Sequence, residues 1–152
     1  METHMIIRDV LKSKGSRIET VHTHRPVSEI LQLFDERNVS SVVVINPVGK
    51  PLGIVTDRLL IKALAHRGSE ALRLRAADVM DAQAPTCAPA DSIQEALGIM
   101  TERRVRHLLV EYGGEAVGLV SIGDLVKFRL RDSELEARVL RELAYAHMSA
   151  AE

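Results

Sequence analysis

The sequence contains an internal repeat, in which the same order of residue types returns about 66 positions later. Matched pairs include Thr20 and Thr86, Glu29 and Glu95, Arg37 and Arg103, and Val44 and Val110. The offset falls to 65 at Gly53 and Gly118, because the second predicted hairpin turn is one residue shorter. Such self-similarity indicates two copies of one structural unit. Neither copy is long enough to bury a comfortable core alone, so we expect the two to pack together about a pseudo-two-fold axis.

Each copy predicts the order strand, helix, strand, strand, helix, which is an α/β (α+β) fold. In the first copy, the β-branched run Val42–Ile45 is too short for a helix and apolar enough for a buried strand. The other elements predicted there are strands over 18–21 and 52–55 and helices over 28–39 and 59–66, with a further helix over 6–14. We assign 6–68 to the first unit, 69–85 to a connector, 86–130 to the second unit and 131–152 to a helical extension; Met1–Met5 are set aside as a segment of uncertain origin.

A hydroxyl and a carboxylate follow the last predicted strand of the second copy. Ser121 and Asp124 end the segment Gly118–Asp124, directly before a long helical pattern. A carboxylate there suits a ribose, since it accepts hydrogen bonds from two sugar hydroxyls, and the free N–H groups of a helix start suit a phosphate. The first copy, Gly53–Leu59, keeps the hydroxyl as Thr56 but has Leu59 in place of the carboxylate.

Composition restricts the function classes. The 20 basic and 21 acidic residues nearly cancel, which differs from the basic footprint of a nucleic-acid-binding protein. We find no apolar run of the roughly 18 residues that a membrane span requires and no secretory signal. Cys87 is the single cysteine, so no internal disulfide forms, and with no His/carboxylate cluster we expect no metal site. We therefore expect a cytoplasmic protein.

The repeat and its motif resemble the cystathionine-β-synthase (CBS) domain, and the pair resembles a stand-alone Bateman module. Residues 118–124 match the family's pattern of Gly, apolar, any residue, Ser or Thr, two residues and Asp, whereas 53–59 depart from it at Leu59. Further resemblance lies in Val79-Met80, in the segment 86–89 and in the segment 104–110, where Leu109 replaces the usual proline. The resemblance implies binding of AMP, ADP or ATP, with NAD(H) or S-adenosylmethionine in some members.

Carried over by position, Asp124 would hold the ribose hydroxyls and Ser121 a hydroxyl or phosphate. Arg106, His107 and Arg58 would reach phosphate, and the adenine would be bordered by Thr86 and the backbone of Val105–Leu108, which includes Leu108. The other cleft would be a weaker site, since Leu59 removes the ribose acceptor; its candidate residues are Thr20, Ser40, Val42, Thr56 and Asp57. Losing such an acceptor costs on the order of 1.5–3 kcal/mol, or roughly ten- to a hundredfold in affinity.

Simpler interpretations of these residues stay open. Asp124 and Ser121 could act as helix caps, Thr56 could cap the first unit's helix, and Asp57 could interact with its dipole. Arg58 and the cluster around Arg104 could be solvated surface charges.

The helical pattern from Ile122 runs to about Met148, longer than the unit needs. Its apolar residues recur at spacings of three, four and seven, so we expect a homodimer held by this helix; the simpler alternative is a helix folded back on its own unit. The residues are Leu125, Phe128, Leu135, Val139, Leu143 and Ala146.

The resemblance therefore implies a regulatory module that binds an adenosine nucleotide, senses energy or redox state, acts on an unidentified partner protein and is not an enzyme. The alternatives are an interaction adaptor with degenerate pockets, which Leu59 and Leu109 favour, and a small nucleotide hydrolase, for which no nucleophile–base pairing is visible.

Overall fold

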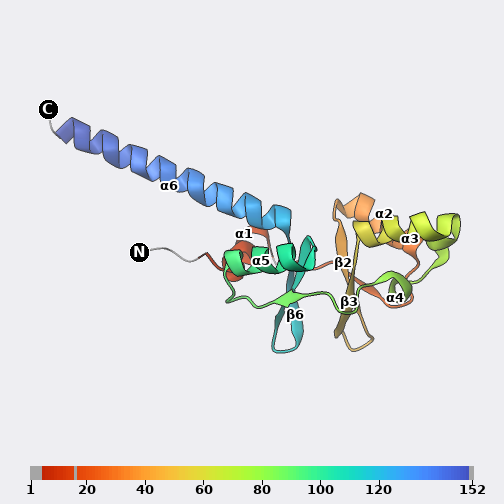
Figure 1. The fold of residues 1–152 in the computed structure, drawn as a ribbon. Coiled ribbons are helices and arrows are strands. Elements are labelled where there is room, and N and C mark those ends of the chain that lie inside the picture. Colours follow the sequence, from red (N-terminus) through yellow and green to blue (C-terminus); the bar gives the residue numbers. More distant parts are fainter. Residues whose placement is uncertain (1–4, 16, 151–152) are drawn as a thin grey trace.

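A computed structural model of the protein describes residues 5–15 and 17–150 and contains two similar three-stranded sheets (Figure 1). The rest of the chain, which includes most of the segment Met1–Met5 and the last two residues, lies outside the described part. The strands are β1 (Thr20–His22), β2 (Ser41–Ile45) and β3 (Pro51–Thr56) in the first sheet, and β4 (Thr86–Cys87), β5 (His107–Tyr112) and β6 (Glu115–Ser121) in the second. In both sheets the first pair of strands is parallel and the second antiparallel.

The helices also repeat. The first unit contains α2 (Val27–Arg37) and α3 (Asp57–Arg67), and the second contains α5 (Ile93–Arg103) and α6 (Ile122–Ala150). Three predicted boundaries were wrong by two residues: β1 begins at Thr20, α2 ends at Arg37 and α3 begins at Asp57. The helix starts earlier because the hydroxyl of Thr56 accepts a hydrogen bond from the Leu59 N–H at 3.3 Å and caps it, as the simpler interpretation of Thr56 proposed.

The short helices exchange between the units. Helix α1 (Ile7–Lys14) lies early in the chain, yet its Ile7, Val10 and Leu11 are buried in the core of the second unit. The segment 69–85, which we expected to be a connector, contains a 3-10 helix (Gly68–Arg73) and α4 (Ala76–Val79). Ala76 is fully buried in the core of the first unit. Each unit is therefore completed in space by a short helix from the segment that precedes the other unit.

A third core joins the two sheets. Val43 from β2, Ile54 from β3 and Leu109 from β5 form one buried cluster, and Val43 and Leu109 occupy matching positions of the repeat. The two sheets thus pack face to face, as expected for the tandem units, and Leu109 fills this contact. Helix α6 begins against the second unit and then runs away from the rest of the molecule (Figure 1). Among the described residues, no helix is both long and apolar enough to cross a membrane.

Candidate functional site

A cavity of about 200 Å³ lies between the two units. The first unit contributes Thr56, at the end of β3, and Asp57–Leu59 and Lys62 from the start of α3. The second contributes Arg104–Arg106 from the turn after α5 and His107 from the start of β5. We call it the inter-unit cavity. Its wall therefore combines a helix N-terminus, whose N–H groups favour an anion, with residues of the other unit.

Four basic side chains line the inter-unit cavity: Arg58, Lys62, Arg104 and Arg106. Arg58 and Lys62 are four residues apart on α3, so they lie on the same side of the helix. Arg106 forms an ion pair with Asp57 at 3.7 Å, and the exposed fractions of these side chains are 59% and 39%. An ion pair that long and that exposed is weak, so a bound anion can replace Asp57 as the partner of Arg106.

His107 is the buried polar residue of the cavity wall, with 6% of its surface exposed. Its Nε2 lies 3.1 Å from the hydroxyl of Ser40, which belongs to the other unit. Burial lowers the pKa of His107; Asp57 and Asp124 act in the opposite direction, while Arg106 and Lys14 add to the lowering. The imidazole is therefore neutral at pH 7 and joins the units by a hydrogen bond rather than by charge.

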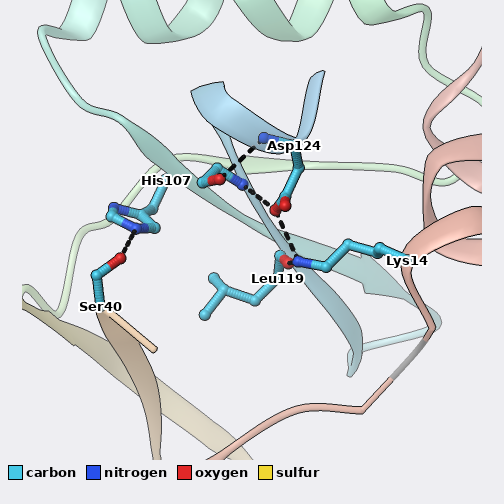
Figure 2. A network of polar contacts seen from close by, with 6 residues as sticks. Lys14, Ser40, His107, Leu119 and Asp124 are labelled. Carbon is cyan, nitrogen blue, oxygen red and sulfur yellow. Dashed lines mark hydrogen bonds and ion pairs between the residues drawn. The ribbon is translucent and has the colours of Figure 1, made fainter. Parts of the chain in front are cut away.

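The turn from β6 into α6 has a different arrangement, which Figure 2 shows. The Ser121 N–H donates to Asp124 Oδ2 at 2.8 Å, and the Asp124 N–H donates to the Ser121 hydroxyl at 3.1 Å. This reciprocal pair caps the helix, as the simpler interpretation of Ser121 and Asp124 proposed.

The same carboxylate has a second, charged partner. Lys14 Nζ, at the end of α1, lies 2.7 Å from Asp124 Oδ2 and 2.8 Å from the Leu119 carbonyl oxygen (Figure 2). Burial would raise the pKa of Asp124, but the bonds from Lys14 and Ser121 outweigh it and hold the pKa below its usual value. The sugar acceptor proposed from the sequence is thus already paired within the protein.

The predicted site residues do not gather at one place. Arg58, Val105, Arg106 and His107 line the inter-unit cavity together with Thr56 and Asp57, which we had assigned to the weaker site. Ser121 and Asp124 do not line it, and the side chains of Leu108 and Val42 are fully buried in the cores of their units. Thr20 and Thr86 are exposed on the first strands of the two sheets, and Ser40 contacts His107. The cations and the carboxylate that we expected at one site are therefore separated.

Sequence reasoning missed Lys62, Asp81 and Lys14 as candidates. Lys62 was identifiable, since it follows Arg58 by one helical turn. Asp81 lines the cavity from the segment after α4, and Lys14 reaches Asp124 from α1. Neither contact follows from the chain order, because both depend on the exchange of the short helices between units.

Cys87 and the possible metal-ligating side chains are further candidates for a functional site. Burial and the nearby Asp91 raise the pKa of the Cys87 thiol to about 12, so it stays protonated at neutral pH. Within residues 5–15 and 17–150, no group of three His, Cys, Asp or Glu side chains could hold a metal ion.

Solved structures resemble the whole two-unit body. A CBS-domain protein from Agrobacterium tumefaciens is 32% identical, with a TM-score of 0.81 over 85% of this chain and 96% of its own. A CBS-domain protein from Pyrobaculum aerophilum, complexed with AMP, is 21% identical, with a TM-score of 0.70 over 79% and 89% of the chains, and shows likeness of fold alone.

Several curated relatives are longer than this chain. A mitochondrial CBS domain-containing protein of Arabidopsis thaliana, CBSX3, is 29% identical over 80% of this chain and 63% of its own length. The chain spans between 37% and 63% of the length of three curated relatives that it matches. The family model described as "CBS domain" matches residues 7–66 and again 76–131. The two sheets, the exchanged helices and this double match agree that the chain belongs to the CBS-domain family, as a tandem pair of CBS units.

Proposed function

We propose that this CBS pair is a regulatory module that binds a phosphorylated adenosyl ligand in the inter-unit cavity. The observation that carries the proposal is the set of four basic side chains, two from each unit, around one cavity at a helix N-terminus. Each unit supplies part of the anion's partners, so a ligand there interacts with both units at once. Such a ligand biases how the two units sit relative to each other.

The proposed site differs from the main site that was expected from the sequence. The expected ribose acceptor, Asp124, is paired with Lys14, whereas the cations line the cavity beside Leu59. We therefore expect affinity to come from the phosphate groups more than from the ribose. At about 200 Å³ the cavity is smaller than the roughly 300–1,000 Å³ of typical ligand pockets, so the phosphate end would occupy it and the nucleoside would extend beyond it.

AMP, ADP and ATP are the first ligands to test, with NAD(H) and S-adenosylmethionine as alternatives and no metal required. The AMP complex of the Pyrobaculum protein supports AMP as a probe. We further propose that the module is cytoplasmic, forms a homodimer through α6 and transmits ligand binding to a separate protein, rather than catalysing a reaction.

The test is a calorimetric titration with AMP, ATP, NADH and S-adenosylmethionine. Arg58→Ala and Arg106→Ala should each weaken binding by roughly tenfold or more, because a charge-assisted hydrogen bond contributes about 1.5–3 kcal/mol. Arg67→Ala changes an arginine at the other end of α3 and should leave the affinity unchanged. Binding that survives both cavity variants would contradict this site.

A second candidate function is an interaction adaptor without a ligand. Leu59 favours it, because this residue of the cavity wall has no polar group for a sugar. Failure of all four ligands to bind at millimolar concentration would support the adaptor. Steady release of product from ATP and Mg²⁺ would instead show an enzyme.

A further inference from the structure

A second hollow lies on the first unit, between α3 and the segment 74–79 that contains α4 (Figure 1). Its volume is about 450 Å³, which is within the roughly 300–1,000 Å³ of typical binding pockets. We call it the lateral groove. Its lining residues from α3 recur at spacings of three and four and so share one side of the helix. The lining consists of Leu59, Lys62, Ala63, His66 and Arg67 from α3 and Leu74, Asp78 and Val79 opposite them.

The second unit has an aromatic ring where the lateral groove is open. Ala63 of α3 matches Phe128 of α6 at the offset of 65 that holds for this part of the repeat. Phe128 packs against the core of the second unit, in which Val10 is 1% exposed. Val79 matches Val10, because each follows the aspartate that caps its short helix, yet Val79 is only half-buried. The groove therefore contains the space that a phenylalanine side chain occupies in the other unit.

The lateral groove also carries positive charge. Lys62 and Arg67 are cations at neutral pH, and neither forms an ion pair within the described part of the chain. Asp78 is the acidic residue of the lining, and its Oδ2 accepts a hydrogen bond from the Arg75 N–H at 2.8 Å, which caps α4. The groove thus combines an apolar space with cations that are open to acidic partners.

We propose that the lateral groove binds an acidic segment of the regulated partner protein through one aromatic side chain. The ring occupies the space that Phe128 fills in the second unit and packs against Leu74 and Val79. Acidic residues on either side of the aromatic residue pair with Lys62 and Arg67. Aromatic side chains in pockets supply much of the affinity of such interfaces, and complementary charges supply selectivity.

The lateral groove is adjacent to the inter-unit cavity, because Leu59 and Lys62 line both. A partner in the groove therefore contacts the same helix whose first turn lines the proposed ligand site. The proposal deepens the regulatory function proposed above by naming the chemistry of the partner, and it rests on that function for the existence of a partner. Binding in the groove itself requires no nucleotide.

The test titrates the acetylated and amidated tripeptide Glu-Phe-Glu into the full chain without nucleotide and follows the backbone amide NMR shifts. The perturbed amides should cluster at Ala63, Leu74 and Val79. Lys-Phe-Lys should not bind. Glu-Ala-Glu should bind about tenfold more weakly than Glu-Phe-Glu, because it lacks the ring that is buried in the groove.

Variants of the chain provide the matched controls. Ala63→Phe should weaken Glu-Phe-Glu binding about tenfold, because its own ring fills the groove, and it should fold, because the second unit has phenylalanine at the matching position. Ala65→Phe, exposed on the same helix but outside the groove lining, should leave binding unchanged. Arg67→Glu should weaken binding roughly threefold, whereas Arg129→Glu on the other unit should not change it.

Absence of these shifts at millimolar peptide, equal binding of Lys-Phe-Lys, or full affinity of a folded Ala63→Phe would overturn the proposal. Phenylacetate that binds as tightly as the tripeptide would assign the groove to a free aromatic acid, and a changed sedimentation mass in Ala63→Phe would assign it to a second copy of the chain. Both results would also overturn the proposal. Titration of AMP into Arg106→Ala tests the inter-unit cavity separately, so failure of one site is distinguishable from failure of the other.

Discussion

Arg104 and Asn38 occupy matching positions at the ends of α5 and α2, and both have left-handed backbones, with φ of 54° and 53°. Asparagine tolerates this conformation better than arginine does. Arg104 also lines the inter-unit cavity, whereas Asn38 does not. The arginine therefore retains a strained backbone at the place where the proposed anion binds, which is consistent with a functional role.

We predict opposite effects from exchanging these two residue types. Arg104→Asn should raise the free energy of unfolding by about 0.5–1 kcal/mol by relieving backbone strain, and it should weaken AMP binding by removing a cation. Asn38→Arg should lower the free energy of unfolding and leave AMP affinity unchanged. Urea denaturation and calorimetry measure the two quantities. Equal AMP affinity in Arg104→Asn would remove Arg104 from the site.

His107 gives the protein a predictable dependence on pH. Because burial lowers its pKa in the folded state, the unfolded chain binds a proton more readily as the pH falls below the ordinary histidine value. The contribution of the neutral His107 imidazole to the free energy of unfolding is therefore complete above about pH 6.5. It is lost as the pH falls toward the pKa of the folded state, by up to about 1.4 kcal/mol per pH unit. His107→Gln keeps a polar group near Ser40 and should lack this loss. Urea unfolding at pH 7.5 and pH 5.5 measures it; equal pH dependence in both proteins would contradict the assignment.

Among the helices and strands, β3 and β6 use glycine for close packing with the exchanged segments. A Cβ on Gly53 would lie 2.6 Å from the backbone carbonyl oxygen of Asp81, whereas one on Gly118 would lie 2.5 Å from the Leu11 side chain. The backbone near Gly53 also forms two hydrogen bonds, since the Ile54 N–H and the Asp81 N–H each donate to the other's carbonyl. A side chain can rotate away from a clash, but a hydrogen-bonded backbone cannot do so without losing its bonds.

We therefore predict that Gly53→Ala is more destabilising than Gly118→Ala. The first should lower the free energy of unfolding by about 2–3 kcal/mol and the second by about 1 kcal/mol, within the range of overpacked cores. Urea denaturation of the two single variants gives the comparison directly. An equal or reversed order would mean that the segment around Asp81 moves more readily than Leu11.

The repeat made the order of the elements, the two sheets and their contact predictable from the sequence. Matched residues such as Val44 and Val110 specified the strands, and the strand-to-helix turn after Ser121 was correctly located. The packing of α1 could not be predicted, because the amphipathic pattern of a short helix shows that Val10 is buried but not in the core of which unit. The candidate site could be predicted only in part for the same reason, because the contacts of Lys14 and Asp81 depend on exchanged segments that are distant in the chain.

At the scale of the whole molecule, the requirements of a nucleotide site are divided between two places. The inter-unit cavity has the cations but has Leu59 where a ribose acceptor would lie, and the start of α6 has the acceptor, Asp124, paired with Lys14. His107 is influenced by both places: it lines the cavity, forms a hydrogen bond with Ser40 of the other unit and is affected by the charge of Asp124. An anion in the proposed site would therefore change the electrostatic environment of an imidazole that the Lys14–Asp124 pair also influences.

Helix α6 extends beyond the part of the chain that the family model matches, which ends at residue 131. Its apolar side chains there are largely uncovered; Leu135, Leu140 and Leu143 are 56%, 67% and 62% exposed. Contiguous exposed apolar surface of this kind marks an interaction site. The opposite side of the helix carries charges of both signs, which suits solvent. We propose that a second copy of the chain covers the apolar side.

We predict that full-length chains carrying Leu135→Gln, Val139→Gln and Leu143→Gln together are monomeric, while the unchanged protein is a dimer. The three residues lie on one side of α6, and glutamine preserves helix propensity while removing the apolar contact. Glu134→Gln, Arg138→Gln and Arg141→Gln, on the charged side of the same helix, form the matched control and should leave the dimer intact. Sedimentation equilibrium at micromolar concentration, with and without AMP, measures the mass. A monomeric unchanged protein under both conditions would refute the dimer. A dimer that survives the three apolar changes would move the interface to the body of the CBS pair, where ligand binding in the inter-unit cavity would act on it directly.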